Sequence, residues 1–277
     1  MAASSAPASL FDITDRVIVV TGATGVLAGS AARYLAAQGA NVVFLGRDRV
    51  RLDKALADTG ELPGQTAAFS CDVLNRADLE RVCEAVMAKF GRVDALVNAA
   101  GGNQPGAVIL PTQTFLDLDM SAYKQVLGLN LEGTVLPSLV FSKVFAAQKS
   151  GNIVNFSSMA AQQVVTRVMG YSNAKAAVDN FTKWLAVELA NKFGSGLRVN
   201  AVAPGFFVAD QNRRLLLNED GTPTARGQAV LTKTPFKRFG EAPELHGALH
   251  FLLSDASAFV TGTVIAVDGG FSCFSGV

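Results

Sequence analysis

A tyrosine and a lysine lie four positions apart, Tyr171 and Lys175, in a stretch with a helical pattern. Residues at this spacing share one face of a helix, so the phenol and the ammonium group point into one site. Tyrosine is a poor acid-base catalyst near neutral pH because its reference pKa is about 10, and a neighbouring cation favours the phenolate. This spacing occurs in many helices, so the pair is a catalytic candidate only if other residues of a catalytic site accompany it.

Ser158 could supply the second part of such a site. It closely follows residues 153–156, a largely apolar segment that we expect to be a buried strand. Open α/β sheets build their sites at the carboxyl ends of their strands, where a serine hydroxyl can hold a substrate carbonyl oxygen. Ser158 together with a glycine-rich turn near the amino terminus favours catalysis over a chance pattern.

That turn reads VTGATGVLAG over residues 20–29 and stands between an expected strand and an expected helix over residues 26–37. Gly22 permits a sharp turn, and Gly25 lets backbone amides approach a pyrophosphate. The helix N-terminus adds bare N–H donors and a partial positive charge. Ala28 occupies the third small position, which needs close packing only. The turn therefore predicts a dinucleotide site, although a turn without a ligand is the alternative.

The end of the second expected strand bears on which dinucleotide binds. It reads Gly46-Arg47-Asp48. NAD-binding sheets usually place an acid at this strand tip, whereas an arginine nearby accommodates a 2′-phosphate. We therefore favour NADP(H) over NAD(H). Two alternatives stay open: Arg47 could be a solvated surface residue, and Asp48 could reach the ribose.

The elements that must position these residues alternate along the chain. Short β-branched runs are separated by helical patterns, and continuously apolar strands of this kind indicate a parallel sheet covered on both faces. We predict a doubly wound α/β fold, a seven-stranded Rossmann sheet in one domain over residues 1–277. The expected strands are residues 17–20, 41–45, 66–70, 95–97, 153–156, 198–201 and 264–267.

Two features interrupt this regular pattern. The connection over residues 204–240 is longer than ordinary loops, and we expect it to be a substrate loop. Expected helices over residues 122–148 and 172–192 carry few charges and are apolar around much of their circumference. Such helices are covered on more than one side, either in a deep monomer core or by pairing between subunits, and we favour an oligomer.

Composition excludes several classes of protein. Of the 277 residues 49% are hydrophobic and 17% charged, with a net charge of +1, so neither disorder nor nucleic-acid binding is indicated. The chain shows neither a signal peptide nor a long apolar run, and we expect a cytoplasmic protein with small-molecule partners and no membrane. Three cysteines and two histidines indicate buried reduced thiols and no metal site.

The chain resembles the short-chain dehydrogenase/reductase family over nearly its whole length. The matching motifs are TGATGVLA, Asp72 in CDV, the NAAG segment at 98–101, Asn130, Ser158, Tyr171, Lys175 and Pro204-Gly205. Departures are Ala99, where the family more often has asparagine, and Ala209, where a cofactor-bonding threonine is usual. The resemblance implies nicotinamide-dependent oxidoreduction and a homotetramer, with a homodimer as the alternative.

The resemblance also implies roles. Tyr171 would be the general acid in reduction and the base in oxidation, Ser158 would polarise the carbonyl, and Lys175 would also bind the nicotinamide ribose. Asn130 would hold a water that links Lys175 to solvent, or could merely satisfy backbone in its own helix. Asp72 would meet the adenine, or could cap the following helix. The implied cofactor-binding residues are Gly22, Thr24, Gly25, Val26, Leu27, Arg47, Asp72, Val73, Asn98, Ala99, Ala100, Gly101, Tyr171, Lys175, Pro204, Gly205 and Phe207.

Within the family the chain looks most like the D-mannonate oxidoreductase (fructuronate reductase) branch, on segments such as LVNAAGGNQP and DQNRRLLLNEDGTPTARG. A sugar acid needs hydroxyl partners and a cation for its carboxylate. The expected substrate residues are Asn103, Ser158, Gln211, Asn212 and Arg213, with Arg167 as a second cation. Arg213 and Arg214 could instead face solvent. The alternatives are a gluconate, polyol or 3-oxoacyl reductase, or a dinucleotide-sensing regulator.

Overall fold

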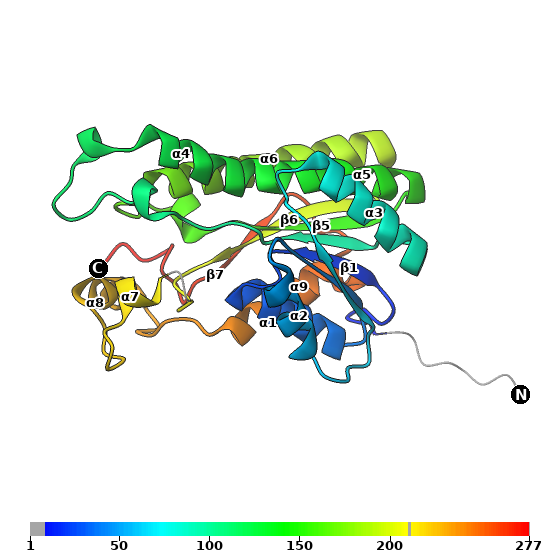
Figure 1. The fold of residues 1–277 in the computed structure, drawn as a ribbon, viewed down its shortest axis with the longest axis horizontal. Coiled ribbons are helices and arrows are strands. Elements are labelled where there is room, and N and C mark those ends of the chain that lie inside the picture. Colours follow the sequence, from blue (N-terminus) through cyan, green and yellow to red (C-terminus); the bar gives the residue numbers. More distant parts are fainter. Residues whose placement is uncertain (1–8, 210–211, 277) are drawn as a thin grey trace, which may run out of the picture.

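The structure is a computed structural model that describes residues 9–209 and 212–276. All seven expected strands are present and pair in parallel, which confirms the predicted doubly wound sheet (Figure 1). Their order is β3-β2-β1-β4-β5-β6-β7. The strands are β1 (Val17–Thr21), β2 (Asn41–Gly46), β3 (Thr66–Ser70), β4 (Ala95–Asn98), β5 (Gly151–Phe156), β6 (Leu197–Pro204) and β7 (Val264–Val267).

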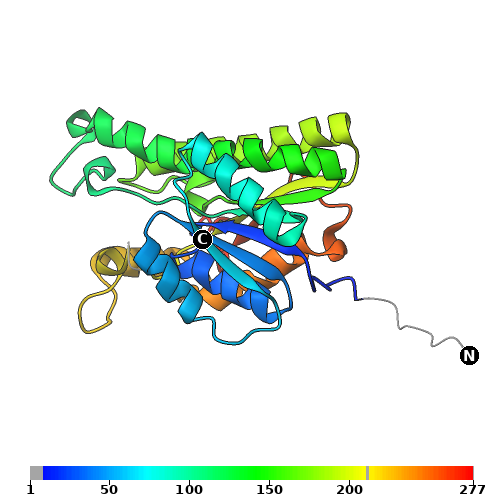
Figure 2. The ribbon, with the colours of Figure 1, turned by 45° about the vertical axis from the view of Figure 1, so that its right-hand side comes forward.

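Helices cover both faces of the sheet, as Figures 1 and 2 show from two directions. The layer of α3, α4, α5 and α6 lies on one face, and the layer of α1, α2 and α9 on the other. Each face has its own apolar core, because the strand side chains alternate between the two clusters. The helices are α1 (Val26–Ala37), α2 (Arg49–Ala57), α3 (Arg76–Phe90), α4 (Met120–Leu127), α5 (Gly133–Gln148), α6 (Met169–Phe193), α7 (Arg213–Leu216), α8 (Ala225–Lys233) and α9 (His246–Leu253).

The strand order reverses between β1 and β4, and this reversal fixes where a ligand can enter. The chain winds from β1 outward to β3, returns to β4 on the other side of β1, and then winds outward to β7. In open sheets of this kind the crevice lies at the carboxyl ends of the strands beside the reversal. The glycine-rich turn follows β1, and the NAAG segment follows β4, so both line this crevice.

The helix expected over residues 122–148 is not a uniform α-helix. It begins two residues earlier, as α4, and passes through a π-helical segment, Gly128–Glu132, before continuing as α5. Asn130, the implied catalytic asparagine, lies in the middle of that segment. Single π-helical turns within α-helices occur frequently at functional sites.

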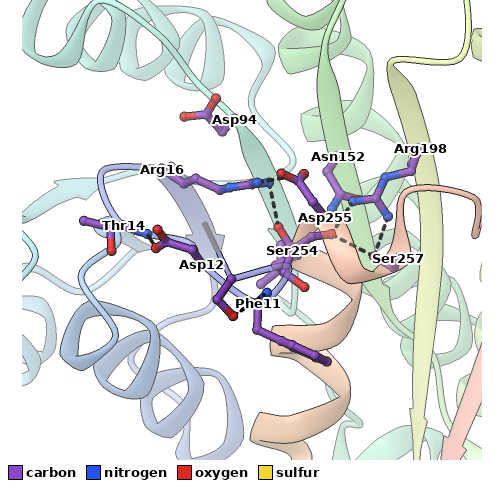
Figure 3. Close-up of polar contacts among 12 residues, drawn as sticks. Phe11, Asp12, Thr14, Arg16, Asp94, Asn152, Arg198, Ser254, Asp255 and Ser257 are labelled. Atoms are coloured by element: carbon purple, nitrogen blue, oxygen red, sulfur yellow. Dashed lines mark hydrogen bonds and ion pairs between the residues drawn. The ribbon is translucent and has the colours of Figure 1, made fainter. Parts of the chain in front are cut away.

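A polar network closes the opposite, amino-terminal edge of the sheet (Figure 3). Arg16 forms an ion pair with Asp255 at 2.7 Å and donates to the carbonyl of Leu253 at 3.1 Å. Arg198 on β6 donates to the Ser257 hydroxyl at 2.8 Å and to the Ser254 carbonyl at 3.1 Å. Burial and the charge of Arg16 lower the pKa of Arg198, and Asp255 opposes this. The network ties strands to the segment after α9 and supports the fold.

The long connection over residues 204–240 is partly helical. It contains α7 and α8, and isolated bridges join Phe207 to Gly240 and Leu217 to Pro223. The carboxyl-terminal segment lies beside it (Figure 1), where Ser275 accepts a hydrogen bond from Lys233. These contacts give the connection a defined shape at the carboxyl edge of the sheet.

Three expectations from composition can be compared with the described residues. None of their helices is long and apolar enough to cross a membrane. They contain no group of three or more His, Cys, Asp or Glu side chains placed to hold a metal ion. Cys71 and Cys83 are buried, but Cys273 is exposed. The prediction of three buried thiols was therefore wrong for Cys273, because it lies outside the sheet and the helices that form the core.

Candidate active site

Lys175 is buried on α6 beside the end of β5. Its Nζ donates a hydrogen bond of 2.8 Å to the carbonyl of Phe156 and lies 5.6 Å from the centre of the Tyr171 ring. Burial lowers the pKa of Lys175 to about 8, whereas the negative charge of Asp179, one turn further along α6, opposes this. The ammonium group of Lys175 therefore changes its charge within a few pH units of neutrality.

The phenol of Tyr171 is packed against a small apolar cluster formed by Ala107, Ala122 and Val126. Burial raises the pKa of Tyr171, and a hydrogen bond with the Ser158 side chain opposes the rise. The expectation that the pKa of Tyr171 is lowered was wrong, because burial has the largest effect on it and the Lys175 ammonium group donates a hydrogen bond to the Phe156 carbonyl. A raised pKa keeps the phenol protonated, as a proton donor must be.

Ser158 stands where β5 ends, and its backbone is extended. Its hydroxyl oxygen accepts a hydrogen bond of 3.2 Å from the amide of Ala160, and the side chain also meets Tyr171. The structure thus brings together Ser158, Tyr171 and Lys175, as predicted, although they come from two elements. The preceding Ser157 donates to Asp179, a partly buried pair that the sequence analysis did not single out.

Asn130 is fully buried and connects α4 to the segment after β4. Its Oδ1 accepts from the amide of Gly102 at 3.0 Å, and its Nδ2 donates to the carbonyls of Gly102 at 2.7 Å and Val126 at 2.8 Å. A Cβ on Gly101 would lie 2.6 Å from Oδ1 of Asn130 and 3.4 Å from Nζ of Lys175. Asn130 therefore bonds backbone in its own helix and also positions the NAAG segment against the lysine.

The glycine-rich turn packs directly against the NAAG segment. Gly22 has a φ of +67°, and a Cβ there would lie 2.8 Å from Cα of Ala100. Thr21 Oγ1 accepts from the amides of Ala99 and Ala100, both at 3.0 Å. Gly22 is thus required by its conformation and by the close approach of two loops. Ala99, the departure from the family pattern, keeps its backbone contact.

The amino end of α1 fits a pyrophosphate. Gly25 is the N-cap and provides no side-chain cap, so the first amides of α1, including those of Val26 and Leu27, lack a capping side chain. Ala28 is buried as expected. The next residue, Gly29, was missed: a Cβ there would lie 2.8 Å from the Ala23 carbonyl, so this glycine sets the packing of α1 on the turn.

At the end of β2, Arg47 is exposed. Asp48 accepts a hydrogen bond of 3.1 Å from the amide of Arg51 and caps α2. The carboxylate is therefore engaged in the cap. Arg51 was not a candidate, yet its Nη2 donates to the carbonyl of Thr24 in the glycine-rich turn at 3.4 Å. Two arginines, Arg47 and Arg51, consequently lie on the α2 side of the turn.

The remaining cofactor candidates have structural contacts of their own. Asp72 accepts from the Leu74 amide at 3.0 Å, whereas Asn75 caps α3, so Asp72 is not that cap. Asn98 donates to Ser138 and Asn155 from a buried position, both at 2.9 Å. The others are Val73, which is buried, Pro204, which ends β6, Gly205, which packs on Asp268, and Phe207, whose buried ring packs on Gly240.

The substrate candidates are only partly placed at the site. Asn103 follows the NAAG segment, and its Oδ1 accepts from the Gln104 amide at 2.9 Å. Asn212 donates to the Phe207 carbonyl and accepts from the Ala209 amide, both at 2.8 Å, so its side chain holds its own loop. Arg213 is exposed, and Gln211 lies outside the described residues.

Arg167 has an unusual backbone for a residue with a side chain. Its φ of +76° is left-handed, a conformation that persists in non-glycine residues only where the surroundings enforce it. Its carbonyl accepts a hydrogen bond of 3.0 Å from the amide of Ile109, in the segment that follows Asn103. Arg167 therefore lies where the segment after β4 meets the start of α6.

Comparison with known proteins places the chain in a large group. Residues 22–272 match a family model described as Enoyl-(Acyl carrier protein) reductase. An uncharacterized oxidoreductase of Haemophilus influenzae is 42% identical over 277 residues, 96% of each chain. A 3-oxoacyl-[acyl-carrier-protein] reductase of a Synechocystis species is 33% identical over 95% of this chain and 99% of the relative.

A crystal structure superposes over most of the chain. It is a Haemophilus influenzae protein, provisionally assigned as a D-mannonate oxidoreductase, with bound NAD. The TM-score is 0.89 at 42% sequence identity, with 96% of this chain and 98% of that chain covered.

Proposed function

The chain belongs to the short-chain dehydrogenase/reductase family and is an oxidoreductase, and we propose that it interconverts D-fructuronate and D-mannonate with a nicotinamide cofactor. The observation that carries the substrate is the likeness, over nearly the full length of both chains, to the NAD-bound structure provisionally assigned to that reaction. The residues gathered at the carboxyl edge of the sheet supply the groups that ketone reduction needs.

A bound nicotinamide cofactor would supply or accept the hydride, and the protein would supply the proton and the orientation. In reduction, Ser158 donates a hydrogen bond to the substrate carbonyl oxygen, and the protonated phenol of Tyr171 gives that oxygen its proton. In oxidation the same phenol oxygen takes the proton back. The two groups meet in the structure, so one substrate oxygen can contact both.

Lys175 and Asn130 act around this proton transfer. The ammonium group of Lys175 lies beside the phenol ring and makes the loss of the Tyr171 proton less costly during turnover. Asn130 holds the Gly101–Gly102 backbone next to the lysine. The uncapped amides at the start of α1 would hold the cofactor pyrophosphate, and Gly22 allows the glycine-rich turn and the NAAG segment to touch.

The preference for NADP(H) is a separate part of the proposal. Arg47 at the tip of β2 and Arg51 against the glycine-rich turn are two cations suited to a 2′-phosphate, while the Asp48 carboxylate is engaged in capping α2. The related crystal structure holds NAD, so the affinities of this chain for NADH and NADPH need to be compared directly. Titrating the enzyme with NADH and NADPH, and following cofactor fluorescence, decides between them.

An assembly of copies in the cytoplasm is also proposed. Trp184 and Val187 on α6 are each 61% exposed, and Leu139 on α5 is 49% exposed. These apolar side chains lie on the outer helix layer and suit pairing with a second copy, within a homotetramer or a homodimer. Sedimentation velocity on the purified chain measures the state.

The experiment that tests the proposed function is a turnover panel. The enzyme is assayed with D-fructuronate, other hexuronates, 5-keto-D-gluconate, neutral ketoses and a 3-oxoacyl thioester, each with NADH and with NADPH. The proposal expects the highest kcat/KM for D-fructuronate. A higher value for the thioester would assign the chain to the activity of its Synechocystis relative instead.

A further inference from the structure

We propose that Arg167 and Arg226 together form the site that binds the substrate carboxylate, in place of Arg213. This inference rests on the proposed function, because it assigns the recognition of the acid group within the same active site. It joins a residue just before α6 to a residue on α8, within the long connection over residues 204–240.

The position of Arg226 is fixed by contacts across the fold. Its Nη1 donates to the Thr166 hydroxyl at 3.3 Å and its Nη2 to the Thr166 carbonyl at 3.0 Å. Thr166 is the neighbour of Arg167, so two arginines that are 59 positions apart in the sequence meet at one place. An arginine has five N–H donors, so these two bonds leave donors for a ligand.

Two like charges at one place require an explanation. Burial and the positive charge of Arg167 both lower the pKa of Arg226, which places the two guanidinium groups within electrostatic reach of each other. Neither forms an ion pair with an acid among residues 9–209 and 212–276. An anion between them would relieve the repulsion.

Another pair of neighbouring arginines, with a structural role, is accompanied by a carboxylate. At the amino edge of the sheet Arg16 and Arg198 also interact unfavourably, but there Asp255 pairs with Arg16 at 2.7 Å and favours both charges (Figure 3). The described part of the chain gives Arg167 and Arg226 no such carboxylate. The lack of a protein carboxylate beside these two arginines, among the residues described, is expected of a site in which the substrate carboxylate supplies the negative charge.

Location and backbone geometry point the same way. Arg167 precedes the catalytic Tyr171 by four positions and is held in a left-handed conformation by the bond from Ile109. Residues held in this conformation cluster at active sites and ligand clamps. In D-fructuronate the ketone and the carboxylate belong to one six-carbon chain, so a carboxylate site must lie close to the phenol that protonates the ketone oxygen.

The test measures binding without turnover. The enzyme is saturated with reduced cofactor, and calorimetry then measures the affinity for D-mannonate and for D-mannitol, which has a hydroxymethyl group in place of the carboxylate. Arg167→Gln and Arg226→Gln should each weaken D-mannonate binding by ~10-fold or more and change D-mannitol binding by less than about twofold, as expected for a lost charge-assisted contact. Arg214→Gln, at an exposed arginine on α7, is the matched control and should change neither.

Two further variants separate recognition from loop support. Thr166→Val removes one acceptor of Arg226 but no charge, and Arg226→Lys keeps a cation at the site. If Arg226 only clamps the loop, Thr166→Val will weaken D-mannonate and D-mannitol binding alike, as will Arg226→Gln, and the proposal is overturned. If it binds the carboxylate, Arg226→Lys will retain more D-mannonate affinity than Arg226→Gln.

The outcomes also distinguish this site from the proposed function. If the wild-type enzyme binds D-mannonate through the two arginines but does not reduce D-fructuronate, the proposed carboxylate site stands and the proposed reaction is refuted. If all variants reduce D-fructuronate as well as the wild type does, the proposed reaction stands and the proposed carboxylate site is refuted. A wild-type enzyme that binds D-mannonate no better than D-mannitol also refutes the site.

Discussion

The Nζ of Lys175 donates a hydrogen bond of 2.8 Å to the carbonyl oxygen of Phe156, the last residue of β5. This bond ties α6, which carries Tyr171 and Lys175, to the strand after which Ser158 lies. It also orients the ammonium group in a buried place, where its pKa falls to about 8. The ammonium group of Lys175 therefore loses its charge as the pH rises through about 8, and the effect on activity can be measured.

The first prediction concerns pH. Reduction needs a protonated Tyr171 and a charged Lys175, and the lysine is charged below its pKa of about 8. We expect kcat/KM for ketone reduction to be constant at neutral pH and to fall as pH rises through that value. Asp179→Asn removes a charge that raises the lysine pKa, so the fall should begin at lower pH. Initial rates from pH 6 to 10 check this, and an unshifted profile would contradict it.

The second prediction concerns Gly101. A Cβ there would meet Oδ1 of Asn130 at 2.6 Å, so Gly101→Ala forces Asn130 and the neighbouring lysine to move. We expect a loss of kcat of ~10-fold or more and, from overpacking, a destabilisation of ~1–3 kcal/mol. The control is Gly128→Ala, because a Cβ at Gly128 meets nothing within 4 Å. Equal kcat values for the two variants would show that catalysis does not depend on the close contact between Gly101 and Asn130.

The third prediction concerns the cofactor. Replacing Arg47 and Arg51 together with glutamine should weaken NADPH binding by ~10-fold or more and leave NADH binding nearly unchanged, because only the 2′-phosphate loses a partner. Arg49→Gln is the control, since Arg49 pairs with Asp53 on the surface of α2. Fluorescence titration gives the dissociation constants. Equal weakening of both cofactors would indicate that the arginines support the loop rather than select the phosphate.

The fourth prediction separates the two edges of the sheet. Asp255→Asn removes the counterion shared by Arg16 and Arg198, but the Asp255 side chain is 67% exposed, which limits its contribution. We expect a loss of ~1 kcal/mol in the free energy of unfolding, measured by urea denaturation. The kcat/KM should stay at the wild-type value because the network lies at the edge opposite the active site. A marked loss of activity would show that the two edges are coupled.

Local patterns in the sequence predicted most of the fold and the centre of the site. The strands were recognisable because buried parallel strands are continuously apolar, and Tyr171 with Lys175 because a helix brings residues four apart together. Asp179 follows Lys175 at the same spacing, so the signal that reveals Tyr171 could also have revealed Asp179.

What the sequence did not reveal depends on contacts between distant elements. Arg226 meets Thr166 only because the long connection folds over the start of α6, and Arg51 meets Thr24 only because α2 packs beside the turn. Gly29 matters because of one carbonyl in the turn before it. The pKa of Tyr171 was misjudged because burial, which a spacing does not report, raises it more than the hydrogen bond with Ser158 lowers it.

The measurement that tests the central claim most directly is the turnover of D-fructuronate by the wild-type enzyme and by Tyr171→Phe, with cofactor binding measured in parallel. The wild type should reduce D-fructuronate to D-mannonate. Tyr171→Phe should leave cofactor binding largely intact and lose ~10²-fold to 10⁴-fold in kcat, because the hydroxyl group that carries the transferable proton is removed. Near-wild-type turnover by Tyr171→Phe, or no reduction of D-fructuronate by the wild type, would contradict the account.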